Sequence, residues 1–264
     1  MVLEFTSQAR STPLPNVQIV GLAADNLLVS FNPTNPTKAQ TLQIKGIAGT
    51  LIGIDVRPAD GLLYGLTNRN QIYTINPTTG EPKLISTLSV PFNGGFRAGV
   101  DFNPVPDRLR LVNADGQNFR VNVDTGMVTV DKPLNYVAGD VNVSTNPRVG
   151  AAAYTNAFPG APSPMNVTPP TRTTQLFDID SRRDVLVLQN PPNDGGLQTI
   201  GNLGVDFNTV AGFDIFSPRA GENTAFAVSN STLYTIDLAS GSAKSMGQIG
   251  NGSFRLIGIT VLAQ

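Results

Sequence analysis

The sequence has 264 residues, of which 40% are hydrophobic and 14% are charged, and its formal net charge is −1. This balance provides no basic surface, so we expect neither a nucleic acid partner nor membrane insertion. The sequence contains no Cys and no His, which excludes disulfide frameworks, thiolate or His-ligated zinc sites, and Ser-His-Asp or Cys-His catalysis. The composition therefore favours a protein without enzymatic activity.

The chain is expected to consist of an N-terminal extension, residues 1–16, and a single domain, residues 17–264. The extension has no apolar core long enough for a signal peptide. We expect a soluble protein that is cytoplasmic or is secreted after processing, and the oligomeric state stays open.

Residues 53–80 form the sequence unit on which the rest of the chain is built. Short apolar runs such as Leu63 to Leu66 and Ile72 to Ile75 are each closed by Gly, Pro, Asn or Asp. This pattern is typical of antiparallel strands joined by tight turns, and no run is long enough to predict a helix.

The unit returns without a gap 46 residues later, at residues 99–126. The full repeats are expected near residues 53–98, 99–150, 151–211 and 212–255, with a fifth formed by residues 256–264 plus 17–52. A repeat completed by both chain ends predicts a closed ring. We therefore predict an all-β fold, a single five-bladed β-propeller whose last blade is closed by N-terminal and C-terminal strands.

Three turn glycines recur at the ends of the repeats, namely Gly80, Gly126 and Gly241. We expect each to adopt a positive φ angle, which glycine tolerates better than other residues.

The second repeat is the most polar, with Arg108, Arg110, Asn113 and Arg120 at positions where the first repeat has mostly uncharged side chains. Strand alternation places Arg108 and Arg110 on one face. With Asp101 and Asp107 nearby in sequence, the arginines could form a clamp for an anion or a carboxylate. A salt-bridged face between two blades is the structural alternative, and it is the one that we favour.

The innermost strands carry Asp55, Asp101 and Asp214 at equivalent positions, with Ala153 and Thr260 at the same place in the other two repeats. Around a central channel, these carboxylates together with Asn103 would suit a hard cation such as calcium. Alternatively, each Asp accepts a hydrogen bond from the backbone of the next blade. We favour this structural role and commit to no cofactor.

Two irregular loops interrupt the third repeat, at residues 155–172 and 189–196, and both are rich in Pro and Gly. Long loops on propeller faces often carry binding residues. Equally, these two loops could be flexible surface segments without a binding role.

Several segments, among them DRLR at residues 107–110 and NPPNDG at residues 190–195, resemble a bacterial family described as domain of unknown function 4394, many of whose members are cyanobacterial. The resemblance extends over roughly residues 22–261. It implies a propeller-like fold and no assigned activity or catalytic residues.

Three classes of function are compatible with the sequence. The first, which we favour, is a non-catalytic binding or scaffold protein for a small molecule, a glycan or a protein. The second is a carbohydrate- or phosphoester-directed hydrolase that uses carboxylates in the central funnel, with Asp55 and Asp101 about 5 to 10 Å apart. The third is a cell-surface or assembly protein, for which a large exposed apolar face is expected.

Overall fold

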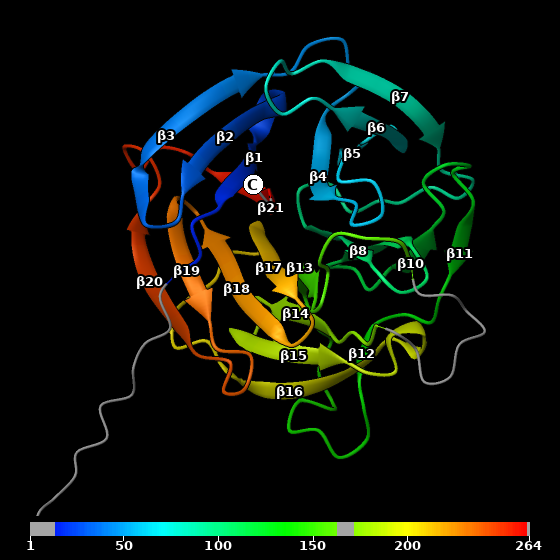
Figure 1. The fold of residues 1–264 in the computed structure, drawn as a ribbon. Helices are drawn as coiled ribbons and strands as arrows, with labels where there is room; N and C mark the ends of the chain where they lie inside the picture. Colours follow the sequence, from blue (N-terminus) through cyan, green and yellow to red (C-terminus); the bar gives the residue numbers. More distant parts are fainter. Residues whose placement is uncertain (1–13, 163–171, 263–264) are drawn as a thin grey trace, which may run out of the picture.

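A computed structural model describes residues 14–162 and 172–262 of the chain. Five small sheets stand around a central axis like the blades of a fan (Figure 1). The only helical segments in the described residues are two short 3-10 turns, η1 (Ala24–Asn26) and η2 (Pro192–Asp194). No helix in these ranges is long and apolar enough to cross a membrane. The predicted five-bladed β-propeller is confirmed.

Blade A joins the two ends of the chain. From the channel outward it consists of β21 (Leu256–Leu262), β1 (Gln18–Ala23), β2 (Leu27–Asn32) and β3 (Asn35–Gln43). The C-terminal strand β21 pairs antiparallel with β1, with Gln18 opposite Leu262 and Ala23 opposite Leu256. The predicted closure by N-terminal and C-terminal strands is therefore confirmed.

The next two blades are formed by continuous stretches of the chain. Blade B consists of β4 (Leu51–Val56), β5 (Leu63–Thr67), β6 (Gln71–Ile75) and β7 (Pro82–Thr87). Blade C consists of β8 (Ala98–Asn103), β9 (Arg108–Asn113), β10 (Asn118–Val121) and β11 (Val128–Val130).

The last two blades complete the ring. Blade D contains β13 (Val149–Tyr154), β14 (Leu176–Asp180), β15 (Val185–Gln189) and β16 (Gly196–Asn202). Blade E contains β17 (Ala211–Arg219), β18 (Glu222–Ser229), β19 (Thr232–Ile236) and β20 (Ala243–Gln248).

Blade D has a fifth, outermost strand, β12 (Asn135–Tyr136), which pairs parallel with β16. The repeat pattern assigns these residues to the second repeat, which forms blade C. They cross to blade D because β11 is short and the chain then leaves the sheet, while the Tyr136 hydroxyl donates to Asp180 Oδ2 at 2.6 Å. Blades C and D are thus joined by backbone pairing at their outer edges.

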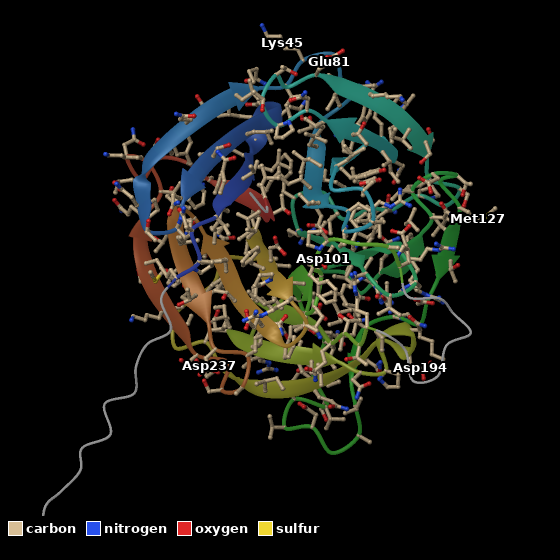
Figure 2. All side chains as sticks on the ribbon, in the orientation of Figure 1. Lys45, Glu81, Asp101, Met127, Asp194 and Asp237 are labelled. Carbon is tan, nitrogen blue, oxygen red and sulfur yellow. The ribbon has the colours of Figure 1, made fainter. Side chains whose placement is uncertain are left out.

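Burial decreases from the channel to the rim of each blade. Five of the six residues of β4 are buried, whereas β7 at the outer edge of the same blade has no buried residue. Figure 2 shows the same gradient, with Asp101 near the centre of the ring and Glu81, Met127 and Asp237 at the periphery. The apolar core therefore lies between neighbouring blades, close to the axis.

Glycines allow the five innermost strands to approach one another closely. A Cβ atom on Gly53 would collide with Val100 in blade C, and a Cβ on Gly212 would lie 2.7 Å from the backbone carbonyl carbon of Gly258 in blade A. Small residues are therefore required where the strands meet in so narrow a ring.

The turn glycines Gly80, Gly126 and Gly241 have φ angles of 75°, 74° and 81°, so the prediction of positive φ is confirmed. Gly126 also lies against the backbone of Thr87 at the end of β7, where a side chain would clash. This turn therefore needs glycine both for its φ angle and for the contact between blades B and C.

Candidate functional site

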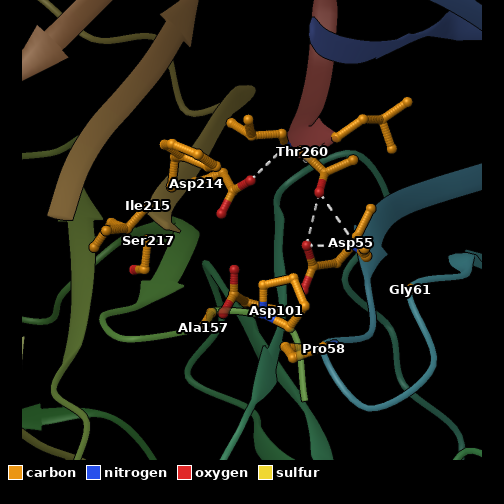
Figure 3. A pocket seen from close by; sticks show the side chains of 14 residues that line it. Asp55, Pro58, Gly61, Asp101, Ala157, Asp214, Ile215, Ser217 and Thr260 are labelled. Atoms are coloured by element: carbon orange, nitrogen blue, oxygen red, sulfur yellow. Dashed lines mark hydrogen bonds between the residues drawn. The ribbon is translucent and has the colours of Figure 1, made fainter. Parts of the chain in front are cut away.

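Three carboxylates converge at one mouth of the central channel. Asp55, Asp101 and Asp214 lie near the C-terminal ends of β4, β8 and β17, and each is at most 7% exposed. One oxygen atom from each residue lies within 4.8 Å of the other two, and Figure 3 shows the side chains pointing toward one another. The repeat therefore brings together residues that are far apart in the sequence.

Each of these carboxylates also connects its blade to the next one around the ring. Asp55 Oδ2 accepts the backbone N–H of Phe102 at 2.7 Å, Asp101 Oδ1 accepts that of Tyr154 at 2.9 Å, and Asp214 Oδ2 accepts that of Val261 at 2.6 Å. Hydrogen bonds of this kind, from an inner-strand side chain to the backbone of the next blade, are called latches below. They are the structural role expected of a residue that is repeated with the fold.

The two remaining inner strands differ because they carry Thr260 and Ala153 at this position. Thr260 Oγ1 accepts the backbone N–H of Val56 at 3.2 Å and donates to Asp55 Oδ1 at 2.9 Å. Ala153 has no polar side-chain atom, so the boundary between blades D and E has no such latch.

The latches leave two carboxylate oxygens facing the channel mouth. Both oxygens of Asp55 accept hydrogen bonds. Among the described residues, Asp101 Oδ2 and Asp214 Oδ1 accept none. No ion pair from a described Lys or Arg reaches any of the three carboxylates. Their negative charge is therefore not compensated within the described chain.

The carboxylates line a pocket of about 170 Å³ whose walls come from loops on this face. Pro58 and Gly61 belong to the loop after β4, and Ala157 and Pro159 to the loop after β13. The Gly160 N–H donates to the Pro58 carbonyl oxygen at 2.9 Å and so fixes the two loops together. One of the two loops predicted to carry binding residues, 155–172, thus contributes to this pocket, although residues 163–171 lie outside the described ranges.

The channel narrows directly beneath the carboxylates. The void there is only about 10 Å³ and is lined by Gly53, Gly99, Gly212 and Gly258 together with small and apolar neighbours. A void of this size holds at most about one water molecule, so a larger ligand would be held in the pocket at the channel mouth.

Burial of three like charges disfavours their ionisation. Burial and the charge of Asp214 raise the pKa of Asp55 well above its usual value, and burial together with Asp55 and Asp214 raises that of Asp101. Burial raises the pKa of Asp214 to about 6. A bound cation would favour the ionised forms, because it replaces the lost hydration of the carboxylates.

The arginines of the second repeat lie away from this pocket. Arg110 is buried at the boundary between blades C and D, where its Nη1 lies 2.7 Å from Asp131 Oδ2. Arg120 forms a bidentate pair with the same carboxylate, with both N–O distances at 2.8 Å. Arg108 donates to the carbonyl oxygens of Pro106 and Asp107 instead.

The two acidic residues expected to pair with these arginines have other partners. Asp107 pairs with Arg57 of blade B, and Asp101 belongs to the channel carboxylates. Asn113 closes its own hairpin, because its Oδ1 accepts the backbone N–H groups of Asp115 and Gln117. The charges of Arg110 and Arg120 are thus paired with Asp131 within blade C, and Arg110 reaches blade D through hydrogen bonds to Tyr154 and Asn193.

Asn103 does not join the three aspartates at the channel mouth. It lines a separate cavity between blades C and D, together with residues from the second predicted loop, 189–196. Its Oδ1 accepts the backbone N–H of Val105 at 3.0 Å. The eight predicted site residues are thus divided among the channel mouth, a charged blade boundary, a hairpin turn and this second cavity.

The chain matches the profile of one known protein family. The profile of the family described as "Domain of unknown function (DUF4394)" matches residues 27–260, which is most of the sequence. The chain belongs to the DUF4394 family. The resemblance seen in the sequence is therefore confirmed, and the family description assigns no activity. No curated protein shows significant similarity to this DUF4394 chain.

Three solved structures show a distant likeness to the DUF4394 chain. An auxiliary nutrient binding protein from Bacteroides ovatus is 11% identical, with a TM-score of 0.47, covering 79% of this chain and 55% of the other. A protein of unknown function from Bacteroides thetaiotaomicron is 15% identical, with a TM-score of 0.48, covering 87% and 59%. An auxiliary nutrient binding protein from the same organism is 12% identical, with a TM-score of 0.45, covering 79% and 55%. The chain spans less than two thirds of the length of these structures.

The structure reveals buried polar residues that the sequence analysis did not single out. Asp131, Tyr154 and Gln189 all take part in the boundary between blades C and D, and Asp178 is fully buried there with no hydrogen-bond partner on either oxygen. Burial raises the pKa of Asp178, although the nearby Arg110 acts to lower it. Repeat alignment could not find these residues, because they are specific to one boundary and have no counterpart at the others.

Proposed function

We propose that this DUF4394 protein is a non-catalytic binding protein that takes a small positively charged group at the mouth of its central channel. The observation that carries the proposal is the pocket of about 170 Å³ lined by three buried carboxylates. Each carboxylate lacks a cationic partner among the described residues. The missing charge is then supplied by the ligand, either as a divalent metal ion or as an ammonium group.

The spacing of the carboxylate oxygens supports a single bound cation. Oxygens within 4.8 Å of one another can all contact one ion placed between them, because calcium lies about 2.3 to 2.6 Å from its ligands. Calcium takes about six to eight oxygens, so water entering from the open mouth would complete its shell. An ammonium group could instead donate one hydrogen bond to each carboxylate.

Equilibrium binding and thermal unfolding test this proposal. Metal-free protein is titrated with calcium chloride in one arm and with methylammonium chloride in the other, at constant ionic strength. A ligand of the native state raises the unfolding midpoint according to its concentration relative to Kd. We expect one arm to give a saturable shift, and the arm that responds identifies the metal ion or the ammonium group.

Two variants give this experiment its specificity. Asp101→Asn removes the charge of a channel carboxylate and is expected to lower the affinity at least tenfold. Asp206→Asn removes the charge of an exposed residue outside the pocket and should leave binding unchanged. The proposal is wrong if neither cation binds, or if Asp101→Asn binds as tightly as the wild type.

Hydrolysis is a second candidate, supported by the raised pKa of Asp101 beside Asp214. A protonated carboxyl next to an ionised one is the arrangement used by enzymes that cleave glycosidic bonds. Only Asp101 and Asp214 keep an oxygen free of hydrogen bonds from the described residues, so they, rather than Asp55, would act. Release of p-nitrophenol from aryl glycosides or aryl phosphates, lost in Asp214→Asn and retained in Asp206→Asn, would establish this activity.

A further inference from the structure

A second cavity lies between blades C and D and differs chemically from the channel pocket. Its volume is about 160 Å³, and Asn103 at the end of β8 and Tyr154 at the end of β13 stand on its walls with Leu176, Leu188, Gln189 and Pro192. None of the residues that line it is charged. The cavity therefore offers hydrogen bonds and apolar surface but no net charge.

Gln189 contributes a buried acceptor that has no donor. The residue is 1% exposed, and its Oε1 lacks any hydrogen-bond partner. The amide orientation is fixed, because Nε2 donates to the Pro192 carbonyl oxygen at 2.6 Å and to Asn118 Oδ1 at 3.3 Å. A flipped amide would place Oε1 against these two oxygens. A buried acceptor that is left unpaired costs free energy, because it has lost its hydrogen bonds to water, and a donor on a ligand would recover part of this cost.

Tyr154 and Asn103 contribute donors to the same cavity. The Tyr154 hydroxyl oxygen accepts Nε–H of Arg110 at 3.1 Å, so its own proton is left to donate. Burial raises the pKa of Tyr154 and keeps this proton in place. The Asn103 Oδ1 is occupied by the Val105 N–H, and its amide NH2 group has two N–H donors, one of which is directed at the Tyr154 hydroxyl oxygen.

The hydroxyl and amide donors of Tyr154 and Asn103, the unpaired acceptor of Gln189 and the apolar walls match the chemistry of hydroxyl groups on a carbon frame. A hydroxyl group donates one hydrogen bond and accepts others, so neighbouring hydroxyls of one molecule could satisfy Gln189 Oε1 and accept from Tyr154 or Asn103. Leu176, Leu188 and Pro192 would contact the C–H surface of such a molecule. Ions are disfavoured, because no lining side chain would compensate their charge.

We propose that the cavity between blades C and D binds a neutral polyol, such as one monosaccharide unit. This site is independent of the channel pocket, which shares none of its lining residues. The two predicted loops thus contribute to different sites, because Ala157 and Pro159 of the first line the channel pocket while Gln189, Asn190 and Pro192 of the second line the polyol cavity.

The direct test is a titration of ¹⁵N-labelled full-length protein monitored by NMR. The neutral probes are D-glucose, D-galactose and myo-inositol, and the charged controls are D-glucosamine and D-glucuronate. We expect at least one neutral probe to shift the side-chain amide signals of Gln189 and Asn103 in a saturable way. The charged controls should bind at least tenfold more weakly than the neutral sugars.

Two variants decide whether the cavity is the binding site. Gln189→Leu removes the unpaired acceptor, and Tyr154→Phe removes the donor while keeping the ring. Each is expected to weaken binding about tenfold, which corresponds to about 1.4 kcal/mol. Tyr154→Phe also keeps the test decisive if Gln189→Leu does not fold, since Gln189 supports the following loop through Pro192.

Matched controls separate binding from general damage. Tyr136→Phe removes another buried hydroxyl at the same boundary, one that donates to Asp180, and should leave polyol affinity unchanged. Asp214→Asn alters the channel pocket and should also leave it unchanged. The proposal is overturned if no neutral probe shifts Gln189 and Asn103, if the charged controls bind equally well, or if folded Tyr154→Phe retains full affinity.

Discussion

The channel mouth and the boundary between blades C and D both bury charged side chains, but they balance that charge differently. At the boundary, Arg110 and Arg120 both pair with Asp131, so each of these charges has an oppositely charged partner within the protein. At the channel mouth, three aspartates face one pocket without a cation from the described chain. Buried charge that is paired internally serves the fold, whereas unpaired charge at an open pocket is available to a ligand.

The largest expected effect on stability comes from removing Arg110, the buried partner of Asp131. The Asp131 side chain is about 5% exposed, and Arg110→Ala leaves it paired only with Arg120 at the edge of the network. Removing one partner of a buried pair typically costs about 3 to 5 kcal/mol, and we expect a loss of this size in the free energy of unfolding measured with urea. Arg120→Ala is the control, and its loss should be smaller because Arg120 is 31% exposed. Equal losses would contradict this account of the boundary.

Removal of one channel carboxylate should make the stability of the protein less dependent on pH. Burial raises the pKa of Asp214 from 3.8 to about 6, so the unfolded chain releases this proton first as the pH rises. Without a bound cation, the folded state therefore loses up to about 3 kcal/mol between pH 4 and pH 6. Asp214→Asn should lose less over this range, apart from a constant change for its altered bond to Val261. Identical pH profiles of urea unfolding for wild type and variant would contradict the raised pKa.

Asp178 is the exception at the balanced boundary, because its carboxylate has no hydrogen-bond partner. Its raised pKa means that ionisation opposes folding at high pH. Asp178→Asn is expected to increase the unfolding free energy by about 1 kcal/mol at pH 8 and to have less effect at pH 4. Asp180→Asn, which alters a carboxylate bonded to Tyr136, should destabilise the protein instead. A destabilised Asp178→Asn at pH 8 would show that the carboxylate is held by Arg110.

The smallest expected effect comes from adding a latch where the repeat lacks one. Ala153→Ser would place a hydroxyl at the position from which Thr260 bonds the next blade, and the equivalent backbone N–H is that of Ile215, which also lies beside the Asp214 carboxylate. One added hydrogen bond contributes about 0.5 to 1.5 kcal/mol, and the unfolding midpoint should rise accordingly. Ala152→Ser is the matched control, since its neighbouring hydroxyl has no equivalent latch to form and should destabilise the buried strand.

The sequence was sufficient to predict the ring because its repeat is nearly regular. The gapless return of residues 53–80 at 99–126 fixed the blade length, and the match between Leu256–Val261 and the first strands of other repeats identified the closing strand. The same alignment placed Asp55, Asp101 and Asp214 at equivalent positions and so predicted their convergence. Features that repeat from blade to blade could therefore be predicted from the sequence alone.

Contacts that occur at only one blade boundary could not be predicted in this way. Arg110 pairs with Asp131, which follows it by 21 residues, rather than with the nearer Asp101 or Asp107. Asn103, two residues after Asp101, leaves the channel because the strand ends and its side chain caps the following turn. Such contacts depend on where loops cross between blades, and no repeat pattern specifies those crossings.

The pairing of β1 with β21 also determines how the protein would respond to mechanical force. Gln18 and Leu262 lie opposite each other at one end of this ladder, so tension applied between them would load its hydrogen bonds one pair at a time. Such unzipping resists far less force than shear, in which all pairs are loaded together. Blade A would therefore open first, while the other four blades, none of which contains β1 or β21, would still be folded.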